Sequence, residues 1–322
     1  MFKVLCTKWV PNSLKEYFAD FVFVCPEEER AYSQEELFEK VKDVDAIFTV
    51  SGTPIRKELI DEAKNLKMIA SMGVGYDHVD VAYCTEKKIP VCNSPTKVTD
   101  PTAEHTIALI LGIFHNLSSY TDRVRNGIWE NHAYGKYMES VNGKILGVIG
   151  FGKIGQCVSR KAKALGMTIK YYDLIRAPKE VEEELDAEFL SLDDLLKISD
   201  CVTLHIPFVK ENYHMLNAEK FNLMKDGSYL INAARGAVID IDALADALES
   251  KKLKGAAIDC FEPEPYKGGK ICDLDNVIFT PHVASETPSG RLNMSIEAIE
   301  GLKKILNGEK PYNLINPESL SK

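Results

Sequence analysis

The sequence predicts an α/β fold built from two doubly wound parallel sheets. The first observation is alternation in the N-terminal third. Short apolar runs typical of strands lie at 4–6, 21–24, 46–50 and 68–71. Amphipathic patterns typical of helices lie between them, at 33–42 and 55–65. Strands that alternate with helices indicate βαβ units, whose strands pair in parallel.

A second alternating series follows residue 142. Its predicted strands are 145–149, 168–173, 201–206, 228–232, 256–259 and 276–280. Its predicted helices are 154–165, 191–197, 217–224 and 241–250. The strands are almost continuously apolar, which favours a parallel sheet covered by helices on both faces.

Two long amphipathic segments, 101–117 and 289–306, flank this second series. We interpret them as crossover helices between two domains. One domain is then discontinuous, with residues 1–99 and 288–322, and the other, 100–287, is inserted into it. Ligands of such folds bind at the carboxyl ends of the strands and at domain interfaces, so the sequence predicts an active site in a cleft between the domains.

Composition excludes several classes of function. The 322 residues carry 39 Lys and Arg against 48 Asp and Glu, a net charge of −9, which disfavours binding to nucleic acid or to anionic membranes. The eight cysteines form no C-x-x-C pair and several lie in apolar runs, so we expect buried thiols rather than disulfides or a resident metal. The longest apolar run, 107–114, is too short to cross a bilayer, and the N-terminus is more typical of a strand than of a signal peptide. We therefore expect a cytoplasmic protein.

A glycine-rich loop follows the strand predicted at 145–149. Its sequence, GFGKIG, contains Gly150, Gly152 and Gly155 in the pattern G-x-G-x-x-G and opens a predicted helix. In this context the first glycine allows a tight turn, the second lets the backbone approach a pyrophosphate, and the third lets helix and strand pack closely. A glycine-rich turn without a ligand is the alternative.

Asp173 ends the next strand, 173 − 155 = 18 residues after the last glycine. A carboxylate at this position accepts hydrogen bonds from a ribose 2′-hydroxyl and repels a 2′-phosphate. The sequence therefore predicts NAD rather than NADP. Arg176 weakens this prediction, because a nearby arginine can accommodate the phosphate.

Three more polar residues follow predicted strands of the second series: Arg235, Glu264 and His282. The carboxyl ends of parallel strands share one edge, so these side chains are expected to meet. Taken singly, each has a structural alternative: a surface ion pair for Arg235, a turn for His282, and competition between Glu264 and the neighbouring Glu262.

The chain resembles the D-isomer-specific 2-hydroxyacid dehydrogenases over nearly its whole length. The matching stretches are SMGVGYDHVD (71–80), VCNSPTKVTDPTAEHTIALIL (91–111), GKILGVIGFGKIG (143–155), HIPF (205–208), NAARGAVID (232–240), DCFEPEP (259–265) and TPHVASET (280–287). The resemblance implies a Rossmann NAD-binding domain inserted into a flavodoxin-like substrate domain. It also implies hydride transfer between nicotinamide and C2 of a small D-2-hydroxy or 2-oxo acid.

The resemblance also implies a role for each polar residue. His282 is the acid/base at the C2 oxygen, Glu264 orients and charges its imidazole, and Arg235 binds the substrate carboxylate. These roles suit the chemistry, since a nascent alkoxide needs a proton and a guanidinium fork matches a carboxylate. The backbone amides of Val74 and Gly75 are further implied to bind the substrate. The implied cofactor contacts are Gly150, Gly152, Lys153, Ile154, Gly155, Asp173, His205, Ile206, Pro207, Ala233, Arg235, Asp259 and His282.

Two stretches depart from the family pattern. Ala284 replaces a glycine common near the nicotinamide, and 212–217 lacks the usual threonine-bearing turn. Neither removes a catalytic group.

The alternative from another class is a dinucleotide-sensing protein-binding module of the co-repressor type. Among enzymes, Glu264 disfavours a formate dehydrogenase, whereas a phosphite-oxidising relative stays open.

Substrate and assembly are less constrained by the sequence. Glyoxylate, hydroxypyruvate, pyruvate and branched 2-oxo acids remain open, and Lys97 keeps phosphoglycerate among the candidates. Relatives pair as homodimers, and the segment 123–139, with Trp129, Tyr134 and Tyr137, is expected to form the dimer arm.

Overall fold

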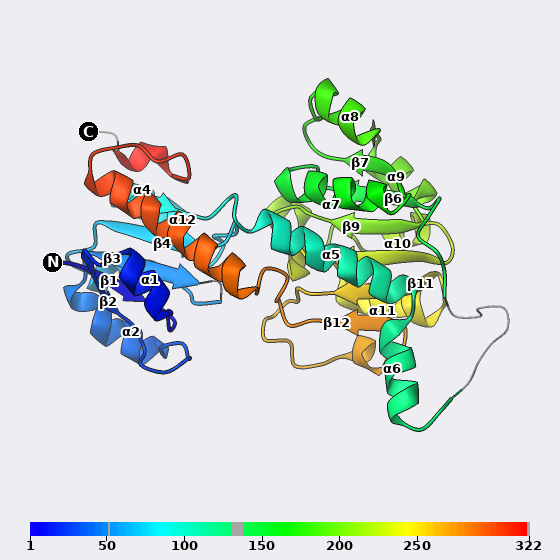
Figure 1. The fold of residues 1–322 in the computed structure, drawn as a ribbon, viewed down its shortest axis with the longest axis horizontal. Helices are drawn as coiled ribbons and strands as arrows, with labels where there is room; N and C mark the ends of the chain where they lie inside the picture. Colours follow the sequence, from blue (N-terminus) through cyan, green and yellow to red (C-terminus); the bar gives the residue numbers. More distant parts are fainter. Residues whose placement is uncertain (51, 130–137, 321–322) are drawn as a thin grey trace. The chain divides into compact units, whose positions relative to one another are not determined.

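The computed structural model describes residues 1–50, 52–129 and 138–320 (Figure 1). The chain forms two compact units. Unit 1 contains Met1–Val98 and Glu286–Lys322, and unit 2 contains Thr99–Ser285. Tyr134 and Tyr137 of the expected dimer arm lie outside the described residues.

Unit 1 is built on a five-stranded, all-parallel sheet in the order β2-β1-β3-β4-β5. The strands are β1 (Phe2–Cys6), β2 (Phe21–Val24), β3 (Ala46–Val50), β4 (Met68–Met72) and β5 (Val91–Cys92). Every side chain of β3 and β4 is buried, as expected for central strands covered on both faces. This order is the flavodoxin-like form of the doubly wound fold.

Short helices join these strands. They are α1 (Asn12–Tyr17), α2 (Gln34–Lys40), α3 (Lys57–Glu62) and α4 (Val81–Glu86), followed near the C-terminus by α12 (Pro288–Leu306). Leu37 of α2 and Leu59 of α3 pack with Leu5 and Ile47 of the sheet in one apolar core. The long helix α12 contacts β4 and α1, so the C-terminal segment completes the unit that the N-terminal segment begins.

Unit 2 is built on a seven-stranded, all-parallel sheet in the order β12-β11-β10-β9-β6-β7-β8. The strands are β6 (Ile145–Ile149), β7 (Thr168–Tyr172), β8 (Glu188–Phe189), β9 (Cys201–Leu204), β10 (Ser228–Asn232), β11 (Leu253–Ile258) and β12 (Val277–Phe279). The strand order reverses between β6 and β9. Their carboxyl ends therefore flank the crevice in which a Rossmann fold binds its ligand.

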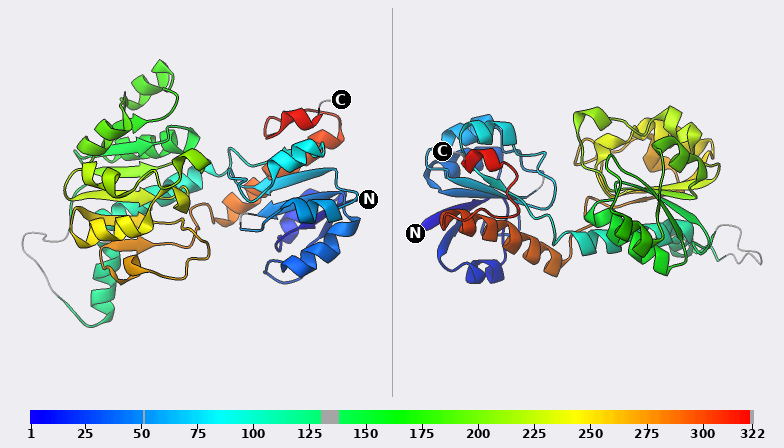
Figure 2. Two further views of the ribbon diagram at one scale, coloured as in Figure 1. Left: turned by 180° about the vertical axis from the view of Figure 1, so that it is seen from behind. Right: turned by 90° about the horizontal axis from the view of Figure 1, so that it is seen from above.

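Helices cover both faces of this sheet (Figure 2). One face carries α5 (Thr99–Phe114), α7 (Lys153–Ala164) and α8 (Lys179–Leu185). The other carries α9 (Leu192–Ile198), α10 (Ala218–Leu223) and α11 (Ile241–Glu249). Each layer buries its own apolar cluster against the strands. The two-sided burial accounts for the apolar strands of the second series.

Some predicted boundaries were wrong. The two-residue strands β5 and β8 were missed, and β9 ends at Leu204, where its pairing with β10 stops, rather than at residue 206. The segment expected as one helix over 101–117 ends at Phe114, and α6 (Leu117–Arg125) begins after Asn116, whose φ of 51° is left-handed. Among the described helices none is both long and apolar enough to cross a membrane.

Candidate active site

The glycine loop joins β6 to α7 in the predicted way, and two of its glycines are required by packing. Gly150 has φ +92°, and a Cβ there would lie 2.6 Å from the carbonyl oxygen of His205. A Cβ on Gly155 would lie 2.1 Å from the carbonyl oxygen of Gly150. Larger residues at either position would push the loop away from β9 or from α7.

Gly152, the N-cap of α7, behaves differently. A Cβ built on it would meet no protein atom within 4 Å, so packing does not explain this glycine. It carries no side chain at the point where the first amides of α7, a helix of 12 residues, begin. Such a helix terminus attracts phosphate through its amide donors and dipole, so the loop fits a dinucleotide. Lys153 is exposed and Ile154 half-buried in the first turn of α7.

Asp173 directly follows β7 and is tied to this loop. One of its carboxylate oxygens accepts the amide of Phe151 at 2.7 Å, and the other accepts the amide of Ile175 at 3.3 Å. The bond to Phe151 fixes the carboxylate beside the glycine turn. Its negative charge thus lies next to the loop that suits a pyrophosphate.

Arg176, the residue that weakens the NAD prediction, is paired. Its Nε and Nη2 each donate to one oxygen of Glu182 at 2.9 Å, and the hydroxyl of Tyr171 donates to the same carboxylate. The hydrogen bond from Arg176, followed by that from Tyr171, outweighs desolvation and lowers the pKa of Glu182. The guanidinium is therefore neutralised within unit 2, which opposes recruitment of a 2′-phosphate.

The HIP motif begins where β9 ends. The imidazole Nε2 of His205 lies 3.0 Å from the hydroxyl of Thr203, and desolvation lowers the pKa of His205 so that the ring is neutral. The divergent stretch after the motif keeps a closed turn. The side chain of Asn212 donates to the carbonyl of Pro207 at 2.8 Å and accepts the amide of Val209 at 2.9 Å.

Arg235 lies in a tight loop after β10. Buried Asn232 holds this loop, because its side-chain nitrogen donates to the carbonyl of Arg235 at 2.9 Å and its oxygen accepts the amide of Ala234 at 3.0 Å. Ala233, between them, is buried. A Cβ on Gly236 would lie 2.0 Å from the carbonyl carbon of Phe261. The glycine thus allows the Arg235 loop to touch the loop after β11.

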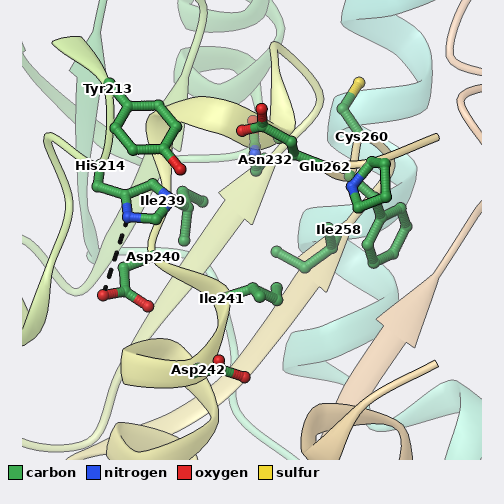
Figure 3. A pocket seen from close by; sticks show the side chains of 13 residues that line it. Tyr213, His214, Asn232, Ile239, Asp240, Ile241, Asp242, Ile258, Cys260 and Glu262 are labelled. Carbon is green, nitrogen blue, oxygen red and sulfur yellow. Dashed lines mark ion pairs between the residues drawn. The ribbon is translucent and has the colours of Figure 1, made fainter. Parts of the chain in front are cut away.

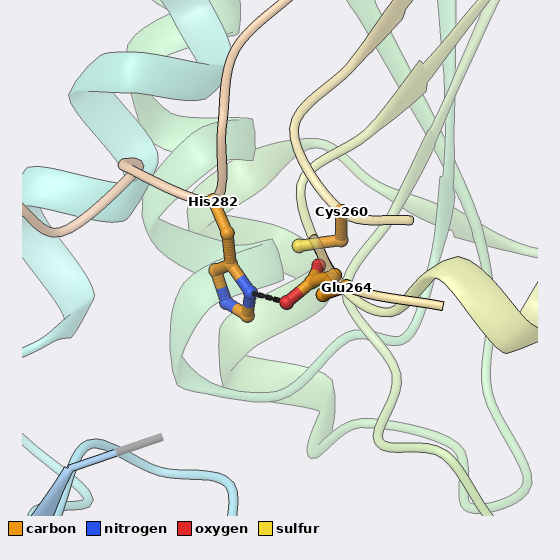
Figure 4. Close-up of side chains that lie close together, drawn as sticks. All are labelled: Cys260, Glu264 and His282. Carbon is orange, nitrogen blue, oxygen red and sulfur yellow. Dashed lines mark hydrogen bonds and ion pairs between the residues drawn. The ribbon is translucent and has the colours of Figure 1, made fainter. Parts of the chain in front are cut away.

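That second loop brings Glu264 to His282. Nδ1 of His282 lies 2.8 Å from one carboxylate oxygen of Glu264, and the other oxygen accepts the amide of Phe261 at 2.9 Å (Figure 4). Desolvation alone would raise the pKa of Glu264. The hydrogen bonds from His282 and Phe261, with the charges of His282 and Arg235, lower it instead. The carboxylate thus stays ionised beside the imidazole and close to a guanidinium.

His282 itself occupies a strained backbone position, with φ 55°. Fully buried Asp259 holds the surrounding loop. One of its carboxylate oxygens accepts the hydroxyl of Thr280 at 2.6 Å and the amide of Val283 at 2.9 Å, and the other accepts the amide of Ala284 at 3.1 Å. The amide of His282 donates to the backbone carbonyl of Asp259 at 2.7 Å. Left-handed residues persist where neighbouring bonds impose them, as here.

A second layer supports Asp259. His105 of α5 lies with Nε2 3.1 Å from the hydroxyl of Thr280 and 3.6 Å from the Asp259 carboxylate. The resemblance assigns Asp259 to the cofactor. Because its protein partners already engage both oxygens, a bond to a nicotinamide amide would be added to three existing ones. Ala284, which replaces the glycine of the family pattern, is buried, and its amide is one of the donors to Asp259.

Glu262 does not reach His282. It lines a cavity of about 300 Å³ with Tyr213, His214 and Asp240 (Figure 3). In that cavity Nδ1 of His214 lies 4.0 Å from the Asp240 carboxylate. Of the two acidic residues that compete in the sequence, the structure thus pairs Glu264 with the histidine.

In unit 1, the loop after β4 carries Val74 and Gly75. The carbonyl of Val74 accepts the side chain of buried Asn93 at 2.9 Å, and the carbonyl of Gly73 accepts the amide of Ser94 at 2.9 Å. Among the described residues, neither the Val74 nor the Gly75 amide has a protein acceptor. The loop therefore turns its carbonyls toward the protein and leaves two amide donors for a ligand.

Several residues that position these loops were not predicted from the sequence: Asn93, His105, Asn232 and Glu297. Glu297 of α12 is only 4% exposed and accepts the amides of Thr96 and Lys97 at 3.2 and 3.1 Å. A carboxylate on the apolar side of an amphipathic helix was a readable signal, because a buried charge requires partners. The other three gave no comparable signal.

The chain is similar to known proteins over nearly its whole length. Residues 107–284 match the model of the D-isomer specific 2-hydroxyacid dehydrogenase NAD binding domain. The glyoxylate reductase of Thermococcus onnurineus is 40% identical, over 99% of this chain and 97% of that protein. The D-3-phosphoglycerate dehydrogenase of Methanocaldococcus jannaschii is also 40% identical, over 88% of this chain but 54% of that protein. The D-lactate dehydrogenase of Aquifex aeolicus, solved with NAD and lactic acid, has a TM-score of 0.83 and 31% identity, and covers 98% of this chain and 99% of that one.

The chain belongs to the D-isomer-specific 2-hydroxyacid dehydrogenase family. It is an NAD-dependent oxidoreductase that transfers a hydride between nicotinamide and C2 of a 2-hydroxy or 2-oxo acid. The predicted family, fold class, cofactor and reaction are thereby confirmed. The co-repressor alternative is not supported, because these relatives are dehydrogenases and reductases.

Proposed function

We propose that this enzyme reduces glyoxylate, or a 2-oxo acid of similar size, with NADH. The observation that carries the proposal is the 2.8 Å contact between the imidazole of His282 and the carboxylate of Glu264, with the charge of Arg235 acting on the same carboxylate. A proton donor, its charge partner and a cation for a substrate carboxylate are the groups that reduction of a 2-oxo acid requires.

The residues act as follows. Bound NADH supplies the hydride. The Glu264 carboxylate accepts Nδ1–H of His282, which leaves Nε2 to deliver a proton to the C2 oxygen. Arg235 binds the substrate carboxylate through its planar fork and polarises the C2 carbonyl. In unit 1, the amides of Val74 and Gly75 are donors for a substrate carboxylate. In the oxidation of a hydroxy acid, His282 accepts the proton that it donates in reduction.

The dinucleotide is held by residues on the edge of the unit 2 sheet. The loop from Gly150 to Gly155 binds the pyrophosphate at the start of α7, with Lys153 and Ile154 in the first turn. Asp173 accepts from the ribose hydroxyls and repels a 2′-phosphate. The HIP motif at 205–207, the loop with Ala233 and Arg235, Asp259 and His282 contact the remaining parts.

Glyoxylate is favoured over phosphoglycerate by how much of this chain the relatives match. The match to a glyoxylate reductase covers 99% of this chain, and the match to the phosphoglycerate dehydrogenase covers 88%. The exposed side chain of Lys97 is the feature that favours a substrate with a second acidic group. Hydroxypyruvate and pyruvate belong in the same test, because they differ from glyoxylate only in the group on C2.

We further propose a cytoplasmic homodimer that pairs through unit 2. Trp129 is 84% exposed and follows α6, from which Leu117 and Val124 also project with 55% of their surface exposed. Aromatic and aliphatic side chains exposed together are typical of an interface. Sedimentation of a 36.0 kDa species alone at micromolar concentration would contradict the dimer.

The experiment that tests the proposed function is NADH oxidation with a panel of glyoxylate, hydroxypyruvate, pyruvate, a branched 2-oxo acid and phosphohydroxypyruvate, with NADPH in parallel. We expect the highest kcat/KM with glyoxylate and NADH. A clear preference for phosphohydroxypyruvate would contradict the substrate proposal. Absence of turnover on all five, with NADH binding shown by fluorescence, would contradict the reaction itself.

A further inference from the structure

A third side chain lies against the His282–Glu264 pair. Cys260 Sγ, a carboxylate oxygen of Glu264 and a ring nitrogen of His282 all lie within 4.8 Å of one another. Figure 4 shows the sulfur of Cys260 turned toward the carboxylate and the imidazole. The reaction proposed above uses the histidine and the glutamate but has no role for the thiol.

These three groups form a donor set with a definite chemical preference. A thiolate, an imidazole and a carboxylate are ligands of Zn²⁺ and of related thiophilic cations, whereas Mg²⁺ and Ca²⁺ take oxygen ligands alone. Zinc bonds of about 2.0–2.3 Å place neighbouring tetrahedral ligands about 3.5 Å apart. The three ligand atoms are at most 4.8 Å apart, so side-chain shifts of about 1 Å would bring them to the distances of a zinc site. The 2.8 Å hydrogen bond between His282 and Glu264 would open to admit the ion.

Burial of the three ligands is uneven, which gives an ion a route. Cys260 is only 2% exposed, whereas the side chains of His282 and Glu264 are 33% and 38% exposed. An ion can therefore enter past the imidazole and the carboxylate, meet the sulfur behind them, and keep a water as its fourth ligand. The positive charge of Arg235, which acts on Glu264, opposes the ion and limits its affinity.

We propose that Cys260, Glu264 and His282 form an inhibitory site for a thiophilic divalent cation of the Zn²⁺ class. On binding, the thiol of Cys260 and Nδ1 of the His282 imidazolium each release a proton to solvent. The thiolate sulfur and Nδ1 then bond the metal, and the imidazole keeps one proton, on Nε2. No bond between heavy atoms of the protein forms or breaks, and no electron is transferred.

Inhibition follows from the protonation state of the metal-bound ring. In the free enzyme Glu264 supports an imidazolium that gives up a proton to the C2 oxygen. In the metal-bound enzyme the only ring proton is on Nε2, and its loss would leave an imidazolate, so the ring is a poor acid. It is also no base, because Nε2 is already protonated. Both directions of the reaction therefore stop. This inhibition rests on the proposed role of His282, whereas metal binding does not.

The binding test uses Cd²⁺ as the probe, because its bond to a thiolate has an ultraviolet charge-transfer absorption. The full-length protein is titrated with Cd²⁺ as wild type, as Cys260→Ala and as Cys272→Ser, the last replacing an exposed cysteine. We expect the affinity for one Cd²⁺ and its absorption to fall at least about tenfold in Cys260→Ala, the lower end of what loss of even an outer-shell partner costs. We expect Cys272→Ser to match wild type.

A second variant keeps the test valid if Cys260→Ala folds poorly. His282→Asn retains the thiol and removes the imidazole, and we expect it also to bind Cd²⁺ at least about tenfold more weakly. Undiminished Cd²⁺ absorption and affinity in both variants would overturn the site.

The inhibition test measures turnover against Zn²⁺, with each variant normalised to its own rate without metal. We expect Zn²⁺ to stop wild type and Cys272→Ser reversibly, with recovery in EDTA, and to need at least about tenfold more metal for Cys260→Ala. Cys260-dependent metal binding with unchanged turnover would overturn the inhibitory role and count against His282 as the acid. It would leave the metal site standing, so the two failures are distinguishable.

Discussion

Asp259 is the residue whose substitution tests how the site is held. Its side chain is fully buried and accepts the Thr280 hydroxyl and the amides of Val283 and Ala284. Asp259→Asn changes one acceptor oxygen into an NH₂ group. The remaining oxygen can keep the hydrogen bonds from Thr280 and Val283. The new NH₂ group then takes the place of the oxygen that accepted the Ala284 amide at 3.1 Å, so two donors face each other. Loss of a charged acceptor together with a buried unpaired donor costs about 2–4 kcal/mol.

The assay is urea unfolding combined with steady-state kinetics. We expect Asp259→Asn to lower the free energy of unfolding by about 2–4 kcal/mol and to lower kcat, because the loop that holds His282 in its left-handed conformation loosens. Asp240→Asn is the matched control. Asp240 caps α11 by accepting the amide of Ala243, and asparagine caps helices equally well. Equal unfolding free energies and equal kcat for the two variants would refute this account of Asp259.

The difference in unfolding free energy between wild type and Asp259→Asn should depend on pH. Desolvation alone would raise the pKa of Asp259, but the hydrogen bonds from His105, Thr280 and the Val283 amide lower it below its ordinary value. A carboxylate with a lowered folded-state pKa stabilises fully above its unfolded pKa of about 3.9, and this contribution declines as pH falls through the folded value. The stability difference between wild type and Asp259→Asn should therefore be constant near neutral pH and shrink below about pH 4. A difference that grew on acidification would contradict the sign.

Further predictions concern the acid/base pair and the choice of cofactor. Glu264→Gln removes a charge-assisted hydrogen bond to His282, worth about 1.5–3 kcal/mol. We therefore expect kcat/KM to fall about 10- to 100-fold with NADH binding intact. An unchanged kcat/KM would exclude the carboxylate from catalysis. Asp173→Ala should narrow the ratio of kcat/KM for NADH over NADPH by at least about tenfold, measured with one 2-oxo acid, and an undiminished ratio would mean that another group discriminates. Glu182→Gln frees the guanidinium of Arg176, whose side chain is exposed and whose ion pair is worth about 0.2–1 kcal/mol, so the KM for NADPH should fall up to about fivefold. A rise in this KM would contradict the idea that the pair with Glu182 keeps Arg176 from a 2′-phosphate.

The sheets were predictable because their strands carry a local signal. Continuous apolar runs such as 46–50 and 145–149 became β3 and β6 with the predicted bounds. The strands β5 and β8 have two residues each, too few for any periodicity, and a neighbouring strand defines them. The end of the helix expected at 101–117 was lost for a different reason: Asn116 adopts a left-handed conformation that hydrophobic spacing does not encode.

The candidate site divides in the same way. The glycine loop was predictable from the sequence because three glycines meet three separate steric or ligand requirements within six residues. The choice between Glu262 and Glu264 rested on resemblance, since both residues share one short loop and only the folded loop separates them. The support that His105 gives to Thr280 joins residues 175 positions apart, and no local pattern reports such a contact.

The proposed reaction depends on His282 exchanging a proton with the C2 oxygen. The most direct measurement is single-turnover reduction of glyoxylate by His282→Asn with bound NADH. Asparagine is chosen because it tolerates the left-handed backbone that His282 adopts, so lost activity reflects the lost imidazole rather than a displaced loop. We expect a fall of about 10²–10⁴ in the rate of reduction, with NADH still bound. A rate within a few-fold of wild type would contradict it.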